Sequence, residues 1–474
     1  MTTFFGHPRG LATLVFTEMW ERFGFYGARA ILIYFMTARI AQGGLGFSTS
    51  QAAIIYGLYL SLVYLLSLPG GWVADNILGQ RKAVLYGGII IAAGYYLMAL
   101  PGLVAFYGAL TLVVLGTGLL KPNVSTIVGG LYAEGDPRRD AGFSIFYMGI
   151  NTGALIAPFI IGTIGEKINY RYGLAIAGLG MTFGVIQYLA GAKHLGDAGY
   201  PPAPNPIARR RALIAGGVIA VIAIVIAVLA STGVISAKGI SDGFGAFLTI
   251  LTVVVFSALL LSPGWTPVER KRLAAIFILF LASAMFWSAF EQAGSTLSLF
   301  AQRNTRLSVF GLGFPASWFQ TLNSIFLVIF APVFAVIWVK MRNREPSTTI
   351  KFTLGLVFVG LGFAVLIPVA NGTAVSPMWL VLTYFLHTIG ELCLSPVGLS
   401  AMTKLAPARI AAMIMGIWFL SISVGEFIGG RVAALYEQFQ LSTLFSIVAL
   451  FCIACAAILV CFNRPMKRLS GGVN

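Results

Sequence analysis

The chain of 474 residues is 58% hydrophobic and 10% charged, and its mean hydropathy is +0.90. Soluble domains carry about 25% charged residues, so this composition excludes an ordinary soluble protein. The net charge of +16 would suggest nucleic-acid binding in a soluble protein. Here the basic residues mostly flank long apolar runs, so we expect no nucleic-acid partner.

The apolar runs predict an all-α polytopic membrane protein with fourteen transmembrane helices. In chain order they cover residues 11–38, 50–74, 83–100, 103–130, 142–165, 172–193, 212–234, 244–262, 272–301, 315–339, 352–370, 377–403, 408–434 and 441–462. With the N-terminus inside, 21 of the 31 Lys and Arg residues lie in cytoplasmic connections and seven in external ones. The positive-inside rule then places both termini in the cytoplasm.

The first predicted helix carries Glu18, Glu21 and Arg22 inside an otherwise apolar segment. Inserting one charge at the bilayer centre costs about 2.5–3.5 kcal/mol, so such residues persist where they face a protein interior or a wet cavity. Their spacing places all three on one helix face. An Arg that approaches or leaves two glutamates changes their proton affinity, which is the chemistry of a proton-coupled carrier. The alternative is a static ion network that only specifies helix packing.

Four more charged residues inside predicted spans are candidates for the site. Arg29 follows Arg22 by two turns, and Glu291 lies in the outer half of the ninth span. Lys121 and Glu391 each lie in the middle of a span. The N-terminal half thus contributes bases and the C-terminal half acids, which suits a zwitterionic substrate, and the same residues could pair across an empty cleft. The alternative is that they form structural pairs only.

Aromatic and amide side chains in the predicted spans would complete a polar cavity. The candidates are Tyr26, Tyr64, Asn151, Trp287, Asn323 and Trp418. Taken singly, such a residue is more often a packing or membrane-interface residue. His387, one turn before Glu391, is expected to pack between helices, so carboxylates must carry most of any proton coupling.

Two parts of the chain resemble each other. Ile145–Gly153 aligns without a gap with Ile417–Gly425, 272 residues later, and both follow the pattern Ile, two aromatics, apolar, small, Ile, polar, any, Gly. Further aligned pairs are Pro122 with Pro396 and Trp20 with Trp287, which are 274 and 267 residues apart. A near-constant offset argues for two homologous halves of six spans each.

The repeat predicts three regions along the chain. Residues 1–195 form an N-terminal six-helix bundle, residues 272–474 form a C-terminal six-helix bundle, and residues 196–271 form a linker with two additional transmembrane helices behind a Pro-rich stretch at 200–206. Two six-helix halves, with a site between them at the midplane, are typical of rocker-switch secondary transporters. We expect a functional monomer, because each chain contains both halves.

The same segments match the signatures of a known family. Four signatures stand in order along the chain: Glu18-x-x-Glu21-Arg22, Phe146-Tyr147-x-x-Ile150-Asn151-x-Gly153, Phe286-Trp287 with Glu291-Gln292, and Gly390-Glu391-Leu392-x-x-Ser395-Pro396. With them the chain resembles the proton-dependent oligopeptide transporters of the major facilitator superfamily. The resemblance covers nearly the whole chain.

The resemblance implies a symporter of di- and tripeptides and protons in a bacterial inner membrane, with no cofactor other than the proton as coupling ion. It implies that Glu18, Glu21 and Arg22 couple the proton. The peptide site would be lined by Arg22, Tyr26, Tyr64, Lys121, Asn151, Asn323, Glu391 and Trp418, to which we add Trp287. The gates would be the ion pairs Arg29–Glu291 on the outer side and Lys121–Glu391 on the inner side.

Two other classes of function stay open. One is a proton-coupled carrier of another small solute, or a drug exporter, although an exporter should lack the bases Arg22 and Lys121. The other is a membrane-embedded enzyme or receptor. The sequence holds no HExxH or GxSxG motif and its predicted cytoplasmic loops are short, so we expect no enzyme. The four cysteines lie in apolar spans, and we expect buried thiols with no metal site.

Overall fold

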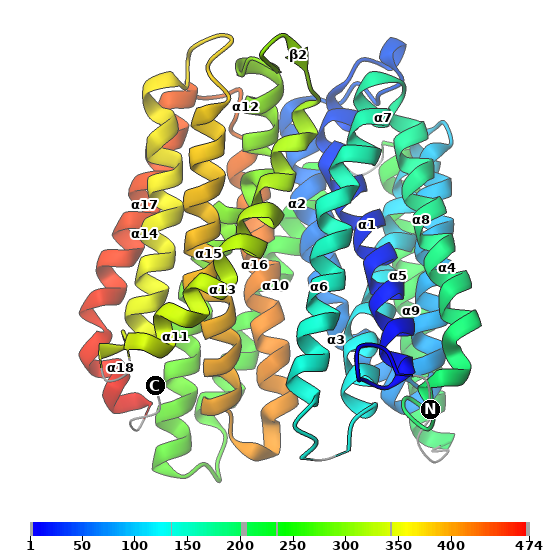
Figure 1. The fold of residues 1–474 in the computed structure, drawn as a ribbon, viewed down its shortest axis with the longest axis vertical. Helices are drawn as coiled ribbons and strands as arrows, with labels where there is room; N and C mark the ends of the chain where they lie inside the picture. Colours follow the sequence, from blue (N-terminus) through cyan, green and yellow to red (C-terminus); the bar gives the residue numbers. More distant parts are fainter. Residues whose placement is uncertain (1–2, 134, 201–205, 234–235, 342–343, 471–474) are drawn as a thin grey trace. The chain divides into compact units, whose positions relative to one another are not determined.

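The computed structural model describes residues 3–133, 135–200, 206–233, 236–341 and 344–470, and they are almost entirely helical (Figure 1). The first nine helices are α1 (Arg9–Thr37), α2 (Thr49–Leu65), α3 (Ser67–Val73), α4 (Gln80–Ala99), α5 (Leu103–Gly130), α6 (Arg139–Ala157), α7 (Thr163–Lys167), α8 (Tyr170–Gly191) and α9 (Pro206–Ser231). The other nine are α10 (Ala237–Leu261), α11 (Pro267–Phe290), α12 (Thr296–Asn304), α13 (Thr321–Met341), α14 (Thr348–Leu366), α15 (Met378–Leu405), α16 (Ala411–Ala433), α17 (Leu441–Cys461) and α18 (Asn463–Leu469). Two short strands, β1 (Ser308–Val309) and β2 (Leu312–Gly313), pair antiparallel after α12.

Within the described residues, twelve helices or runs of consecutive helices are long and apolar enough to cross a membrane. The helix α1 is not among the twelve, because every 18-residue stretch of it carries at least three charged residues. It is 29 residues long, and α9 is 26 residues long. With these two helices the structure has the fourteen spans that the sequence predicts, and the predicted all-α membrane fold is confirmed.

Three of the predicted spans are interrupted well inside their length. The span predicted at 50–74 breaks after Leu65 into α2 and α3. The helix α6 passes into a wider turn at Pro158, where proline lacks the N–H that would continue the helix. The helix α11 ends at Phe290, and the tighter turn Glu291–Gly294 separates it from α12. In a membrane, broken helices are tolerated where the backbone is buried in protein or lines a cavity.

The chain divides into two compact units. Unit 1 holds residues 1–46 and 62–237, and unit 2 holds residues 47–61 and 238–474. The helix α2 is therefore shared, and the two additional helices are divided, with α9 in unit 1 and α10 in unit 2. The predicted domain boundaries after residues 195 and 271 follow the sequence repeat and stay predictions. The Pro-rich stretch that begins the predicted linker lies mostly outside the described residues.

The same helix pairs recur in both units. In unit 1, α1 packs on α6, and α4 packs on α5 and α8. In unit 2, α11 packs on α16, and α14 packs on α15 and α17. Facing glycines join two of these pairs: a Cβ on Gly87 would lie 2.7 Å from the Gly116 carbonyl oxygen, and a Cβ on Gly390 would lie 2.9 Å from that of Gly355. Small residues let helix backbones meet directly, so the packing repeats as the sequence does.

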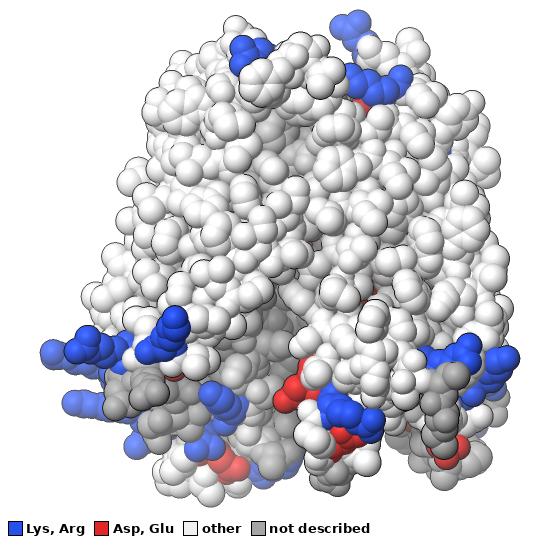
Figure 2. Space-filling model, viewed as in Figure 1, with Lys and Arg blue, Asp and Glu red and all other residues white. Residues whose placement is uncertain are grey.

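Exposed charged side chains are concentrated near the ends of the helices. On the face drawn in Figure 2, Lys and Arg gather near helix ends, and the band between them consists of other residues. Large apolar side chains are exposed on α10 and α13, among them Ile250, Val253, Val333 and Val336. This distribution is typical of helices surrounded by lipid.

Candidate functional site

The helix α1 holds three charged side chains in one buried cluster. Arg22 Nε lies 3.2 Å from Glu18 Oε1, and it also donates a hydrogen bond to Glu21 Oε2. None of the three residues is more than 4% exposed. The Arg22 guanidinium carbon lies 5.1 Å from the centre of the Phe25 ring. The structure thus brings together the three residues predicted for proton coupling, which we call the α1 cluster.

Each member of the α1 cluster keeps one buried polar atom without a hydrogen-bond partner among the described residues. These atoms are Glu18 Oε2, Glu21 Oε1 and Arg22 Nη2. Leaving a buried polar group unpaired costs about 1–3 kcal/mol, so a proton, a water or a ligand is expected to satisfy it. The cluster can therefore take up a proton on a carboxylate oxygen and offer an N–H donor to an anion.

Glycines on two neighbouring helices fix the position of this cluster. A Cβ on Gly153 of α6 would collide with the carbonyl oxygen of Met19, next to the charged residues. A Cβ on Gly180 of α8 would lie 2.6 Å from the Phe23 ring. Only residues without a side chain allow helices to approach this closely. The Gly153 of the repeated signature is thus a packing residue for α1.

Two more basic residues of unit 1 lie over aromatic rings. Lys121 Nζ on α5 is 3.9 Å from the centre of the Tyr64 ring, and Arg29 Cζ on α1 is 5.9 Å from that of Tyr26. A cation–π contact holds a cation in place without neutralising it. Lys121 also acts electrostatically on Glu18. Lys121 thus lies near the α1 cluster, whereas Arg29 lies two turns further along α1.

Two of the predicted lining residues are buried in helix packing. Asn151 Nδ2 donates a hydrogen bond of 2.9 Å to the Tyr147 carbonyl oxygen of its own helix. Trp418 is 3% exposed and fills the space beside Gly398, where a Cβ would collide with the indole ring. These contacts are structural, and the peptide-binding role of both residues stays a prediction.

An acidic site in unit 2 is built by α13 and α15. Asn323 Nδ2 donates to Glu391 Oε2 at 2.9 Å and to Thr388 Oγ1 at 3.1 Å. Thr388 in turn donates to the Tyr384 carbonyl oxygen at 2.7 Å. Glu391 is partly exposed, so the amide orients its carboxylate and leaves it accessible. A carboxylate held in this way can bind an ammonium group.

Two further predicted site residues lie at or just before the break between α11 and α12. Glu291 begins the tight turn after α11 and is 4% exposed. Trp287, one turn earlier, is 6% exposed, and its Nε1 has no hydrogen-bond partner within the described chain. A Cβ on Gly425 of α16 would lie 2.5 Å from the Trp287 Cβ. The glycine thus lets α16 pack directly on this end of α11.

The predicted gates each join one residue of unit 1 to one residue of unit 2. Arg29 and Lys121 belong to unit 1, whereas Glu291 and Glu391 belong to unit 2. Both ion pairs therefore stay predictions.

The sequence analysis missed one buried carboxylate and one hydrogen-bonded contact. Glu426 of α16 is 2% exposed, and an ionisable residue inside a membrane span is itself the signal that could have found it. One turn earlier, Ser423 and Ser61 of α2 exchange hydrogen bonds: Ser61 Oγ donates to the Ser423 carbonyl oxygen at 2.7 Å, and Ser423 Oγ donates to that of Ser61 at 2.9 Å. These bonds attach the first part of α2 to α16 within unit 2.

A polar cluster lies at the ends of membrane spans of unit 2, and its carboxylate is outside them. Thr49 donates a hydrogen bond to Glu437, and Arg303 Nη1 forms an ion pair with Glu437 Oε1 at 2.8 Å. The hydrogen bond from Thr49 lowers the pKa of Glu437, and Arg303 lowers it further. We call these three residues the Glu437 cluster.

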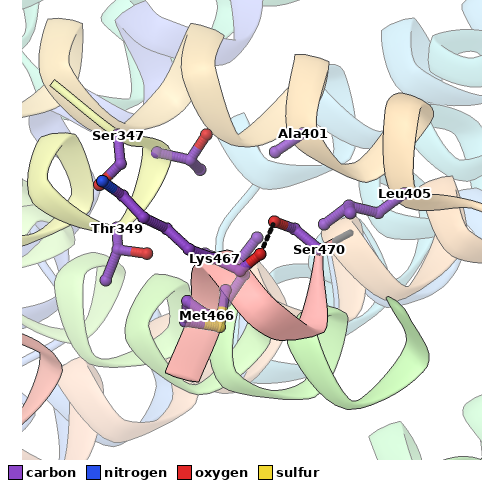
Figure 3. Close-up of a pocket in the computed structure, with 9 residues that line it drawn as sticks. Ser347, Thr349, Ala401, Leu405, Met466, Lys467 and Ser470 are labelled. Carbon is purple, nitrogen blue, oxygen red and sulfur yellow. Dashed lines mark hydrogen bonds between the residues drawn. The ribbon is translucent and has the colours of Figure 1, made fainter. Parts of the chain in front are cut away.

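A small pocket lies beside α18, and Figure 3 shows it. Its lining residues are Leu279, Ser347, Thr348, Thr349, Ala401, Leu405, Met466, Lys467 and Ser470. Within it, Ser470 Oγ donates to the Lys467 carbonyl oxygen at 3.3 Å (Figure 3). Its volume of about 20 Å³ holds about one water, which is too little for a peptide. In the part of the chain that the structure describes, no group of three or more His, Cys, Asp or Glu is placed to hold a metal.

Comparison with known proteins identifies the family. The model of the POT family matches residues 81–451. A di-/tripeptide transporter of Lactococcus lactis subsp. cremoris is 39% identical over 490 residues, which cover 99% of this chain and 98% of that protein. The uncharacterized transporter YclF of Bacillus subtilis (strain 168) is 45% identical over 475 residues, with coverage of 99% and 96%.

Solved structures agree with these sequence matches. A crystal structure of peptide transporter POT in complex with sulfate has a TM-score of 0.93 at 44% identity and covers 99% of this chain and 97% of that one. A POT family transporter in complex with 5-aminolevulinic acid has a TM-score of 0.92 at 36% identity, with 98% of each chain covered. The chain therefore belongs to the POT family and is a multi-pass membrane transporter with the major facilitator fold.

Proposed function

We propose that this transporter imports di- and tripeptides together with protons, by alternating access and driven by the inward proton gradient. The observation that carries the proposal is the α1 cluster, in which two buried carboxylates share one guanidinium and each keeps an unpaired polar atom. The substrate class is supported by the 39% identical relative from Lactococcus lactis, which is named a di-/tripeptide transporter.

The charge of the α1 cluster provides the coupling. Two carboxylates and one guanidinium carry a net charge of −1, and burying a net charge is costly. One proton on Glu18 or Glu21 neutralises the cluster. When a substrate carboxylate draws Arg22 toward itself, the glutamates lose their counter-ion and bind a proton more tightly. Binding of the peptide therefore strengthens binding of the proton and the reverse, as a symporter requires.

The two ends of a peptide call for opposite charges. Arg22 offers the unpaired Nη2, and Lys121 is held over Tyr64, so these bases bind the peptide carboxylate. Glu391, oriented by Asn323, binds the peptide amine. A dipeptide carries its carboxylate and its amine further apart than a free amino acid does, so we expect substrate length to be recognised through these two ends.

The gates follow from the same charges. In the proposed cycle, Arg29 and Glu291 pair to close the outer side, and Lys121 and Glu391 pair to close the inner side. A peptide that occupies Lys121 and Glu391 competes with the inner pair, so substrate binding favours release to that side. The proton is the only coupling ion in this scheme, and no cofactor takes part.

The cellular setting is part of the proposal. The excess of Lys and Arg in alternate loops supports a bacterial inner membrane location with both termini in the cytoplasm. Because each chain contains both units, the monomer is the transporting form. The substrates, protons and membrane lipid are its partners, and nucleic acid is not.

Uptake of labelled dialanine into proteoliposomes, with and without an inward proton gradient, tests the proposal. We expect accumulation only with the gradient, with inhibition by excess di- and tripeptides and none by free alanine. Glu21→Gln should abolish accumulation and retain exchange of peptide across the membrane. Gradient-driven accumulation in this variant would contradict the coupling role of the α1 cluster.

A proton-coupled carrier of another small solute is the second candidate. This candidate is supported by the structurally similar POT family transporter that was solved in complex with 5-aminolevulinic acid. That compound also bears a carboxylate and an amine. Gradient-driven uptake of 5-aminolevulinic acid without uptake of dialanine, in protein shown to be folded, would replace the peptide assignment by this one.

A further inference from the structure

A polar pocket of about 480 Å³ lies in unit 2, away from the residues assigned to transport. It is formed where three membrane spans end, at the last turn of α13, the first turn of α14 and the last turns of α15. Its polar and aromatic lining residues are Trp338, Glu345, Thr348, Lys351, Ser400 and Lys404. Neither the predicted peptide site nor the predicted gates include any of these residues.

A buried lysine supplies a fixed positive charge to this pocket. Lys351 is 7% exposed, and its Nζ lies 4.5 Å from the centre of the Trp338 ring. It also forms an ion pair with Glu345, whose side chain is 44% exposed. Ion pairs with a well-hydrated carboxylate are weak, so Glu345 compensates the lysine only in part.

The surroundings of Lys351 are basic. Lys404 is exposed in the last turn of α15 and adds a second positive charge, so the lining residues carry a net charge of +1 with Glu345 included. Lys340 and Arg344, which adjoin the lining residues in the sequence, are exposed as well. Thr348 begins α14, and the N-terminus of a helix carries a positive partial charge. The pocket therefore favours an anion.

Apolar surface borders the pocket. On α13, Val336 and Val339 are 51% and 76% exposed, and Leu399 on α15 is 42% exposed. Ser400 follows Glu391 by nine residues, which at 100° per residue places it on the opposite face of α15. The pocket thus lies on the side of α15 that faces away from the acidic transport residue. A soluble anion would leave these apolar side chains exposed, whereas the acyl chains of a lipid would cover them.

We propose that this pocket binds the phosphate headgroup of an anionic phospholipid. Lys351 and Lys404 hold the phosphate, the hydroxyls of Thr348 and Ser400 donate hydrogen bonds to it, and the acyl chains lie along the exposed valines of α13. Basic pockets between transmembrane helices near a membrane surface are suited to such headgroups. The site goes beyond peptide transport, and its occupancy can be measured without transport.

Native mass spectrometry of the purified full-length protein tests this site. Binding of phosphatidylglycerol is compared with that of phosphatidylcholine carrying the same acyl chains. Lys404→Gln should lower the affinity for phosphatidylglycerol about fivefold, and Glu345→Gln should raise it by a similar factor. Lys193→Gln, which removes an exposed lysine after α8 in unit 1, is the matched control and should bind phosphatidylglycerol as the parent protein does. Each variant leaves the buried Lys351 in place, and its Tm is compared with that of the parent protein to check folding.

Three outcomes would overturn the assignment. Equal affinity for the two lipids would show that the phosphate charge is not recognised. An equal loss in Lys404→Gln and Lys193→Gln would assign the preference to general surface charge. Displacement of phosphatidylglycerol by inorganic phosphate or glycerol 3-phosphate at concentrations similar to those of a competing lipid would make the ligand a soluble anion.

Discussion

The first helix of unit 1 and its counterpart in unit 2 are packed alike but carry different chemistry. Gly153 of α6 meets the backbone of α1, and Gly425 of α16 meets that of α11. Counted from the aligned Trp20 and Trp287, the charged residues Glu18, Glu21 and Arg22 correspond to Met285, Ser288 and Ala289. The packing thus repeats in both halves, whereas the charges of the α1 cluster occur only in the first. The residues proposed for proton coupling are therefore found at positions where the two halves differ in sequence.

The strongest test of the shared packing is Gly153→Val. The new side chain would collide with the Met19 carbonyl oxygen on the backbone of α1, which cannot rotate away. Overpacking of this kind costs about 1–3 kcal/mol, and more where a backbone must move. We expect a loss of most folded protein, measured as the monodisperse yield in size-exclusion chromatography and as the Tm. Gly216→Val on α9, where a Cβ meets nothing within 4 Å, is the control. Equal yields of the two variants would refute the packing role.

Glu21→Gln separates chemistry from packing. The amide keeps the size of the side chain and removes its charge, so α1 should still pack on α6. We expect gradient-driven accumulation of dialanine to fall at least tenfold, with the Tm nearly unchanged. The control is Glu437→Gln, the same change outside the membrane spans, which should transport normally near neutral pH. A loss of Tm as large as the loss of transport would show that the α1 cluster is a packing device.

Glu391→Gln tests the carboxylate that unit 2 contributes to the proposed peptide site. The variant keeps an oxygen that can accept the hydrogen bond from Asn323 and loses the negative charge. We expect dialanine to inhibit uptake of a labelled peptide about tenfold more weakly, which corresponds to about 1.4 kcal/mol. Asn323→Ala, which releases the carboxylate without removing it, should have a smaller effect in the same direction. An unchanged inhibition constant in Glu391→Gln would remove this residue from the peptide site.

The smallest expected effect concerns the Glu437 cluster and its pH dependence. Because folding lowers the pKa of Glu437, its stabilising contribution is present above the unfolded-state pKa of about 4.3 and is lost as the pH falls through the lower folded-state value. The side chain is 54% exposed, so we expect a contribution of only about 0.2–1 kcal/mol. The Tm of Glu437→Gln should lie slightly below that of the parent at pH 6 and converge with it at pH 3. A constant difference across this range would exclude the charge as the cause.

Local patterns in the sequence were sufficient to predict the spans and the charged residues. The α1 cluster was predicted from spacing within one helix, and the structure brings its members together. Glu391 and Asn323 were both named as site residues, although only the structure shows that they are hydrogen-bonded across two helices. Long-range contacts of this kind have no local signal.

Other features required the structure. The break at Glu291 was not predicted, although Glu291, Gln292 and Gly294 interrupt the apolar segment from 272 to 301, because such an interruption does not by itself distinguish a helix break from a functional site. The facing glycines Gly87 and Gly116 look like any glycines in apolar helices until their partners are known. Trp418 was predicted from its place in the repeat, which does not distinguish a cavity wall from the space beside Gly398 that it fills.

The facing glycines have a mechanical consequence. Where Gly87 meets Gly116, and where Gly355 meets Gly390, backbone lies against backbone and there is no side chain whose rotation could absorb a displacement. Sliding one helix along the other would drive the carbonyl oxygens into the opposite main chain. Each pair, α4 with α5 and α14 with α15, must therefore behave as one stiff rod. Bending during a transport cycle is then expected at the interruptions after Leu65, at Pro158 and at Glu291.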